Sequence, residues 1–324
     1  MVGSGGREHA LARALARTAD VVVVPGNAGM AAAGVTCLAV DPDELRADDV
    51  DLVVVGPEAP LVDGLADRLR ARDVLVYGPG ADGARLEGSK AWMKEVVAAA
   101  GVPTAAYGAF RELAPALAFL RARPGPWVVK TDGLAAGKGV LVTDSLADAE
   151  ADVAAKLAGT SFGPAGTTVV LEEALAGPEL SILAVCDGRT AVALAPAQDF
   201  KRAFDADAGP NTGGMGAYSP VPGVDDCVVA DVLARFVEPT LAELRRRSID
   251  YRGTLYAGLV LTATGPRLLE YNVRFGDPEA QVVLARVTSD LADLLAAAAA
   301  GDLGGRVPTH RPEAAVGVVL AAPG

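Results

Sequence analysis

Residues 127–143 read WVVKTDGLAAGKGVLVT, and this stretch gives the clearest indication of the fold. The apolar run Trp127 to Lys130 predicts a short buried strand that ends in a lysine, and Val140 to Thr143 predicts a second strand. The loop between them, Gly133 to Gly139, is rich in glycine, so its backbone amides could lie against a polyphosphate. It is not a Walker A loop, because its glycine spacing is one residue too short and no Ser or Thr follows the Gly-Lys pair. A hairpin turn with solvent-directed lysines is the alternative interpretation.

The few lysines of the chain gather in such segments. Six of the 29 Lys and Arg residues are lysines, and three of those six, Lys130, Lys138 and Lys201, fall in motif segments. A lysine ammonium is a compact point charge, whereas the guanidinium of arginine is a planar fork. We therefore expect these three positions to require a compact ammonium.

The first hundred residues alternate short strands with helices. Apolar runs closed by glycine- or proline-rich turns predict strands over 21–24, 52–55 and 74–77, and amphipathic patterns predict helices over 7–17, 61–72 and 89–100. This alternation is typical of a parallel sheet, in which ligands lie beyond the carboxyl ends of the strands. The turns at 25–29 and 56–61 fall at that edge of the predicted sheet.

The segment Gly3 to His9, GSGGREH, lies between a very short strand and the first helix. Unpaired backbone N–H groups, the helix dipole and Arg7 suit a phosphate there. The segment is not a dinucleotide fingerprint, because Glu8 occupies the third glycine position of that motif. A plain tight turn is the alternative, and the neighbouring turns favour a shared ligand crevice.

Further along, Thr254 to Leu261 and Arg267 to Asn272 are predicted strands. Because side chains alternate along a strand, Glu270 and Asn272 lie on one face, and their oxygen atoms are ligands that suit Mg²⁺. Arg274 follows just beyond that face and could meet a phosphate or an oxyanion. A buried polar network is the alternative. The other predicted elements are a strand over 168–172, helices over 146–157 and 228–247, and a loop over 209–220.

Composition excludes several classes of protein. Lysine and arginine number 29 against 41 acidic residues, and the resulting net charge of −12 opposes binding to nucleic acid. Cys37, Cys186 and Cys227 are odd in number and lack a CxxC spacing, so we expect no disulfide framework, no zinc site and a reducing cytoplasm. Only two histidines are present, which argues against a Ser-His-Asp hydrolase. No apolar run approaches the roughly 18 residues of a membrane span, so we expect a soluble protein with no membrane partner.

Taken together, the strand lysine, the glycine-rich loop, the Glu172-Glu173 pair and the Glu-x-Asn-x-Arg cluster resemble the ATP-grasp superfamily. Seven motifs in order along the chain are similar to the phosphoribosylamine–glycine ligase (glycinamide ribonucleotide synthetase) family. They are GSGGREHA at 3–10, PGNAG at 25–29, GPEAPL at 56–61, LEGSKA at 86–91, DGLAAGKGV at 132–140, GPNTGGMGAYSP at 209–220 and RFGDPEAQ at 274–281. The last two are highly specific to that family.

The resemblance implies an α/β fold, with a doubly wound N-terminal domain followed by an ATP-grasp fold and with the family's C-terminal domain largely missing. The implied N-terminal domain covers residues 1–100, and the ATP-grasp domain covers residues 101–313 with a lid at about 120–188. Residues 314–324 would be the first strand of a truncated C-terminal domain. Both ends therefore look cut, since only Met1 and Val2 precede Gly3 and the run Ala314 to Ala321 reads as a buried strand. We expect low solubility and little activity from these ends.

The resemblance also implies roles for individual residues. The ATP phosphates would meet Lys90 and Lys130 under the glycine loop, the adenine would meet the backbone from Glu172 to Leu175, and Glu179 would hold the ribose. The implied nucleotide-binding residues are Lys90, Lys130, Gly137, Lys138, Gly139, Glu172, Glu173, Leu175 and Glu179. Those implied for the substrates are Gly5, Gly6, Arg7, Glu8, Asn27, Glu58, Asp199, Lys201, Asn211, Gly213, Gly214 and Met215. Glu270 and Asn272 would hold the metal, and Arg274, Lys130 and Asp277 would take part in catalysis.

The activity implied is ATP-dependent ligation of glycine to 5-phosphoribosylamine through a glycyl phosphate, in purine biosynthesis. ATP and Mg²⁺, or Mn²⁺ in its place, would be the cofactors, and the oligomeric state stays open. Segment 256–262 offers no acidic residue as a second metal ligand, so the metal would have few protein ligands. Two alternatives are an ATP-grasp ligase for another carboxylate and a nucleotide-binding fragment or pseudoenzyme without turnover.

Overall fold

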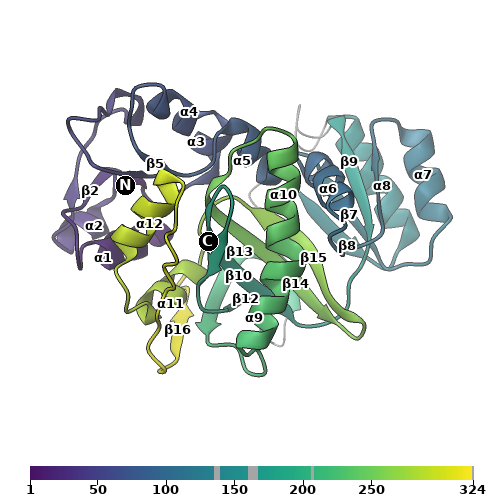
Figure 1. The fold of residues 1–324 in the computed structure, drawn as a ribbon. Helices are drawn as coiled ribbons and strands as arrows, with labels where there is room; N and C mark the ends of the chain where they lie inside the picture. Colours follow the sequence, from purple (N-terminus) through teal and green to yellow (C-terminus); the bar gives the residue numbers. More distant parts are fainter. Residues whose placement is uncertain (135–138, 160–166, 206–207, 323–324) are drawn as a thin grey trace.

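The computed structural model describes residues 1–134, 139–159, 167–205 and 208–322, and the side chains of Pro210 and Asn211 are not among what it describes. Residues 2–77 lie at one end of the molecule and residues 107–173 at the other, with the strands of residues 179–272 between them (Figure 1). Among the described residues, no helix combines the length and the apolar character that crossing a membrane requires.

Five short parallel strands form the N-terminal part. β1 (Val2–Gly3), β2 (Val22–Pro25) and β3 (Thr36–Cys37) make one sheet, and β4 (Val53–Val54) pairs with β5 (Val76–Tyr77). A parallel bridge between Val2 and Val55 joins the two groups, so the strand order is β3-β2-β1-β4-β5. The predicted doubly wound arrangement is confirmed, and the two residues of β1 suffice to pair with β2.

Helices and turns connect these strands. They are α1 (Gly6–Leu15), α2 (Ala28–Ala32), the 3₁₀ turn η1 (Pro42–Glu44), α3 (Glu58–Val62), α4 (Leu65–Arg70), α5 (Ala81–Gly88) and α6 (Lys90–Ala99). The prediction of one helix over 61–72 is wrong, because α3 ends and α4 begins around Gly64. Gly64 has a φ of +81°, a left-handed conformation that glycine adopts without steric cost and that interrupts the helix. Ser89 begins α6 as predicted, since its side chain accepts a hydrogen bond from the Trp92 amide.

An antiparallel sheet in the order β6-β9-β7-β8 forms the opposite end of the molecule. Its strands are β6 (Tyr107–Phe110), β7 (Trp127–Thr131), β8 (Val140–Thr143) and β9 (Val169–Glu173), and α7 (Leu113–Arg121) and α8 (Leu146–Leu157) pack with it around a small apolar core. Lys130 lies near the end of β7, where the sequence predicts it. The interpretation of residues 120–188 as a lid stays a prediction.

The central sheet has the order β11-β10-β14-β15, from β10 (Glu179–Asp187), β11 (Ala191–Ala193), β14 (Arg252–Thr262) and β15 (Gly265–Asn272). The helical segment α9 (Asp226–Val232), the π-helical turn η3 (Leu233–Val237) and α10 (Glu238–Arg246) follow one another as the predicted helix over 228–247. Leu241, Leu244 and Phe236 of this segment share an apolar core with Leu180 and Leu255 of the sheet. Helices α11 (Glu279–Arg286) and α12 (Leu291–Ala300) belong to a second core with α1.

A third sheet has the order β12-β13-β16, from β12 (Gln198–Phe204), β13 (Ala208–Ser219) and β16 (Ala315–Val318). The prediction of a loop over 209–220 is therefore wrong. The many glycines of this segment form a strand because backbone pairing with β12 on one side and β16 on the other needs no side chains.

The prediction of a buried strand at the end of the chain is also wrong. β16 is an edge strand whose side chains alternate, so that Val316 and Val318 are 73% and 74% exposed. The other face of β16 is the covered one, since a Cβ on Gly317 would lie 3.2 Å from Val282 of α11. An unbroken apolar run usually indicates a strand that is covered on both faces, but this strand is covered on one face only.

Candidate functional site

The turn before α1 is organised by Glu8. Its carboxylate is buried and accepts hydrogen bonds from the Gly5 amide at 2.7 Å and from Arg7 Nε at 2.5 Å. Glycines line this carboxylate closely: a Cβ on Gly3, where φ is +133°, would lie 2.3 Å from Glu8 Cγ, and one on Gly56 would lie 2.4 Å from Oε1. Glu8 therefore fixes the shape of the turn, with the amide groups of the first turn of α1 directed out of the helix end.

Two arginines connect this turn to the centre of the molecule through Glu58 at the start of α3. Arg7 lies 3.8 Å from Glu58 and also donates to the Phe275 carbonyl at 3.3 Å, while Arg274 Nε lies 3.3 Å from Glu58. Burial opposes ionisation of Glu58, but the Arg274 and Arg7 guanidinium groups together keep its pKa below its usual value. The predicted phosphate turn and the predicted catalytic arginine are thus connected through Glu58 and the Phe275 carbonyl.

Arg274 is held by a ring of acceptors. Its Nη2 donates to Glu87 Oε1 at 2.8 Å and to Asn272 Oδ1 at 3.1 Å, and its Nη1 donates to the Phe275 carbonyl at 3.2 Å. Glu87 also accepts from the Val273 amide at 2.9 Å, and burial raises the pKa of Glu87 despite Arg274. With Glu58 included, the planar guanidinium bonds to four different groups and has little freedom to turn.

Glu270 lies on β15 at the centre of a group of cations. It is half-buried, and among the described residues no hydrogen-bond donor or ion-pair partner reaches its carboxylate. Burial opposes its ionisation, yet the electrostatic effect of nearby cations lowers its pKa below the usual value. These cations are Lys201, Lys130, Lys90 and Arg274. Four of the cations of a chain of net charge −12 thus lie around one carboxylate.

Each lysine of this group reaches the crevice from a different element. Lys90 at the start of α6 donates to the Gly133 carbonyl at 3.2 Å, and Asp132 ties the same loop to α6 by accepting from the Ala91 amide at 3.1 Å. Lys130 of β7 donates to the Leu269 carbonyl at 3.3 Å, which places it next to β15. Lys201 of β12 pairs with Glu179 and lies 3.6 Å from Asp199.

Glu172 is buried and forms ion pairs with two lysines, Lys130 of this group and Lys94 of α6. Its Oε1 lies 2.8 Å from Lys130 Nζ and its Oε2 lies 2.8 Å from Lys94 Nζ. Burial opposes ionisation, but the two ammonium groups lower the pKa of Glu172 below its usual value. The Glu172 side chain is thus engaged within the protein, and only its backbone is left for the predicted adenine contact.

A second buried acidic group lies beside Lys201. Burial raises the pKa of Asp199 to about 7; Lys201 opposes this shift, whereas Glu279 and Glu179 add to it. Glu279 is buried at the start of α11, where it accepts hydrogen bonds from the Tyr256 hydroxyl and from Ser181 Oγ at 3.3 Å. Asp199 is therefore an acid that changes its charge near neutral pH, next to the cationic crevice.

We expect the Asp199→Asn variant to lose part of the pH dependence of stability. Because the folded-state pKa of Asp199 lies above the unfolded value, the native state binds more protons between about pH 4 and pH 7, so stability falls as the pH rises through this window. This difference in pKa corresponds to a loss on the order of 4 kcal/mol in the parent across this whole window. Urea unfolding at pH 5 and pH 8 measures it. An equal loss in parent and variant would contradict the raised pKa.

The structure brings most of the predicted site residues together, while their roles stay predictions. Asn27 is different, because its side chain is engaged in capping α2 and in donating to the Ser4 carbonyl at 2.7 Å. Asp277 accepts from Gln281 at 2.6 Å and precedes Pro278, which lies next to Gly214 of β13. Gly6, Gly139, Glu173, Leu175, Gly213 and Met215 are described, whereas Gly137, Lys138 and the side chain of Asn211 lie outside the described residues.

Sequence reasoning missed several residues that shape the crevice. They are Glu87, Lys94, Ser181, Tyr256 and Glu279. Glu87 and Glu279 stand inside two of the seven motifs, LEGSKA and RFGDPEAQ, so their position next to the predicted residues was a usable signal. Lys94, Ser181 and Tyr256 stand in ordinary helix or strand patterns, where nothing local marks them.

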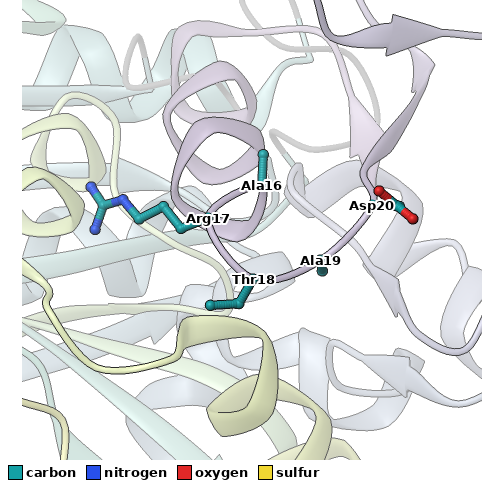
Figure 2. Close-up of a pocket in the computed structure, with 5 residues that line it drawn as sticks. All are labelled: Ala16, Arg17, Thr18, Ala19 and Asp20. Carbon is teal, nitrogen blue, oxygen red and sulfur yellow. The ribbon is translucent and has the colours of Figure 1, made fainter.

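A separate hollow of about 370 Å³ lies at the other end of α1. It is lined by residues 16–20, and in Figure 2 Arg17 and Asp20 point away from each other across the turn. Arg17 donates to the Val287 carbonyl at 2.6 Å, and Thr18 donates to Asp290 at 2.7 Å, so these side chains join the turn after α1 to the connection between α11 and α12. The hollow contains none of the predicted site residues, so the charged cluster around Glu270 is the candidate site.

Comparison with known proteins identifies the family. Residues 1–87 match the family model described as "Phosphoribosylglycinamide synthetase, N domain", and residues 88–280 match "Phosphoribosylglycinamide synthetase, ATP-grasp (A) domain". A phosphoribosylamine–glycine ligase of Streptomyces coelicolor is 50% identical over 99% of this chain and 77% of its own length.

Solved structures agree with this assignment. A crystal structure of phosphoribosylamine–glycine ligase from Thermotoga maritima has a TM-score of 0.88 and 34% identity, over 99% of this chain and 79% of its own. A more distant structure is the biotin carboxylase domain of a Hydrogenobacter thermophilus 2-oxoglutarate carboxylase, solved with ADP and magnesium. It has a TM-score of 0.72 at 15% identity, over 97% of this chain and 72% of its own. This likeness shows the fold alone. The chain belongs to the phosphoribosylglycinamide synthetase family, a family of ATP-dependent ligases built on the ATP-grasp fold.

Proposed function

We propose that this chain ligates glycine to 5-phosphoribosylamine in the cytoplasm, using ATP and forming glycinamide ribonucleotide, ADP and phosphate. The observation that carries the proposal is the cluster in which four cations surround the half-buried Glu270 and which Glu58 joins to the turn before α1. The lysines and arginines of this cluster suit a nucleoside triphosphate on one side and a sugar phosphate on the other.

The nucleotide would lie between the central sheet and the β6-β9-β7-β8 sheet. Lys90 and Lys130 would contact its phosphates, the backbone from Glu172 to Leu175 would meet the adenine, and Glu179 would meet the ribose. The pairing of Lys201 with Glu179 and its proximity to Asp199 support a place for Lys201 beside the reacting phosphate or carboxylate. Lysines are suited to this task because a compact ammonium can approach several phosphate oxygens.

Glu270 and Asn272 would hold Mg²⁺ or Mn²⁺. The residues fit a hard cation: the carboxylate of Glu270 is charged and is not engaged by any described donor, and the amide oxygen of Asn272 lies on the same strand face. No cluster of three or more His, Cys, Asp or Glu side chains suited to a metal occurs among the described residues, so phosphate oxygens would complete the coordination. When bound, the metal supplies charge neutralisation between the nucleotide and the attacking carboxylate.

The reaction would proceed in two steps within this crevice. The glycine carboxylate attacks the γ-phosphate to give glycyl phosphate and ADP, and the lysines bring the two anions together. The amine of phosphoribosylamine then attacks the acyl carbon, and the remaining N–H of Arg274 would donate to the oxyanion of the tetrahedral intermediate. The intermediate collapses as the bond to phosphate breaks, the amine loses a proton to the solvent, and the amide and free phosphate are formed. Gly5 to Glu8 would hold the sugar phosphate, and the Gly213 to Met215 segment with Asp277 would form the glycine pocket.

The test is ADP release by the purified chain in the presence of ATP and Mg²⁺. Whatever the rate of ADP release, we expect it to depend on both glycine and phosphoribosylamine, with glycinamide ribonucleotide detected as the product. Binding of ATP without any ADP release under these conditions would instead support a nucleotide-binding protein without turnover. Release that depends on a different carboxylate would support another ATP-grasp ligase.

Lys130→Met is expected to weaken ATP binding about 10-fold or more, because a hydrogen bond to a charged group contributes roughly 1.5–3 kcal/mol. The apolar chain of methionine fills the space of the lysine stem, so the fold should be retained. Calorimetric titration with ATP measures the effect. Parent-like affinity in the variant would remove Lys130 from the nucleotide site.

A further inference from the structure

Lys94 is a fully buried cation in the second turn of α6. Its side chain is 0% exposed, and its ammonium donates to Thr104 Oγ1 at 2.7 Å and to Glu172 Oε2 at 2.8 Å. The ring of Tyr107 lies 5.5 Å from this ammonium, and the Tyr107 hydroxyl donates to the Lys94 carbonyl at 3.1 Å. Since no part of Lys94 reaches the surface, it is not itself a contact for a ligand in the crevice.

The residue that Lys94 binds is also the partner of a lysine of the crevice. Glu172 offers one carboxylate oxygen to Lys94 and the other to Lys130. Helix α6 thus supplies two lysines, Lys90 and Lys94. Because they are four residues apart, they lie on the same face of the helix. Lys90 is half-buried and donates to the Gly133 carbonyl of the glycine-rich loop, whereas Lys94 is fully buried.

We propose that Lys94 is a positioning residue for the nucleotide: it takes up one oxygen and the charge of Glu172, so that the positive charge of Lys130 remains available to the phosphates of ATP. This inference rests on the proposed function only in placing ATP beside Lys130.

The charge balance of the three groups supports this role. Lys94, Glu172 and Lys130 together carry one net positive charge. Without Lys94, Glu172 and Lys130 form a closed neutral pair, which attracts a phosphate less strongly and holds Lys130 against β9. Burial, together with the charge of Lys130, lowers the pKa of Lys94 to about 8, although Glu172 acts in the opposite direction, so Lys94 carries its charge at neutral pH.

The experiment measures ATP affinity by calorimetry at pH 7 in the full chain, without glycine or phosphoribosylamine. Lys94→Met is expected to weaken ATP binding about 10-fold or more. The double variant Lys94→Met with Glu172→Gln restores the single positive charge, and its affinity is expected to return to within about threefold of the parent. Lys156→Met, which removes another buried lysine that pairs with Asp152 of its own helix, is the matched control and should bind ATP like the parent.

Two results would overturn the proposal. One is parent-like affinity in Lys94→Met, and the other is a double variant that binds no better than Lys94→Met, because a purely structural role would make the two losses add. If Lys94→Met does not fold, Lys94→Gln gives the same comparison, since glutamine keeps a donor for Glu172 and Thr104 but carries no charge. Because only ATP is present, a chain that binds ATP but ligates nothing would count against the proposed ligase function and leave the test of Lys94 intact.

Discussion

Replacing Glu270 by glutamine is expected to lower kcat about 100-fold or more while the protein stays folded. The side chain keeps its size, but the crevice loses the carboxylate that four cations surround and that no described donor engages. A bound metal contributes several kcal/mol of charge stabilisation to the transition state, and each 1.36 kcal/mol corresponds to about tenfold in rate. Glycine binding should change less than turnover, because the metal would act mainly between the phosphate and the attacking carboxylate.

The measurement is ADP release as a function of Mg²⁺ concentration, with Mn²⁺ in a parallel series. Glu150→Gln is the matched control, because it makes the same chemical change at a carboxylate on α8 that pairs with the exposed Arg121. We expect the control to follow the Mg²⁺ dependence of the parent. A Glu270→Gln variant with the rate and the Mg²⁺ dependence of the parent would show that the metal lies elsewhere.

The helices and strands that the sequence predicted well are those in which local pattern and tertiary environment agree. Leu146 to Leu157 is helical as predicted because Ser145 caps it and because its apolar spacing matches the face that covers the β6-β9-β7-β8 sheet. Trp127 to Lys130 forms a strand because both faces of the run are covered. Position Gly64 differs, since a single glycine in a helical pattern does not reveal whether its φ will be positive.

The strand over 208–219 shows why a glycine-rich segment is hard to interpret from sequence. Glycine lacks the side chain whose alternation marks a strand, so the pattern contains turn signals only. Pairing with β12, the strand just before it, and with β16, near the end of the sequence, supplies the information that the segment lacks. Gly214 is nonetheless specified by its surroundings, because a Cβ there would lie 2.4 Å from Pro278.

The residues of the candidate site also differ in whether the sequence alone predicts them. Lysines and glycines that face a ligand recur in recognisable motifs, and sequence reasoning found Lys90, Lys130 and Lys201 for this reason. The groups that hold them are spread over other elements, as Glu172 holds Lys130 and Glu87 holds Arg274. Their function depends on contacts between residues far apart in the chain, and no spacing rule describes such contacts.

Arg274→Lys is expected to lower kcat about 100- to 1000-fold and to leave the KM for ATP within a few-fold of the parent. Removing one donor from an oxyanion site costs about this much in rate, and lysine keeps the charge while losing the planar fork. The guanidinium is oriented by Glu87, Glu58, Asn272 and the Phe275 carbonyl at once, and a single ammonium cannot make all four contacts. Loss of orientation should therefore affect the step in which the oxyanion forms.

This prediction is tested by measuring glycyl phosphate formation separately from complete turnover. Rapid-quench measurement should show glycyl phosphate formation, and with it the first ADP, at a rate closer to that of the parent than steady-state turnover is. Arg267→Lys, at an arginine of β15 that pairs with Glu173, is the control and should change neither rate greatly. If Arg274→Lys instead raises the KM for ATP and keeps kcat, the guanidinium serves the nucleotide. Another of the cations around Glu270 would then have to stabilise the oxyanion. Lys201 of β12, which lies beside the buried Asp199, is the candidate.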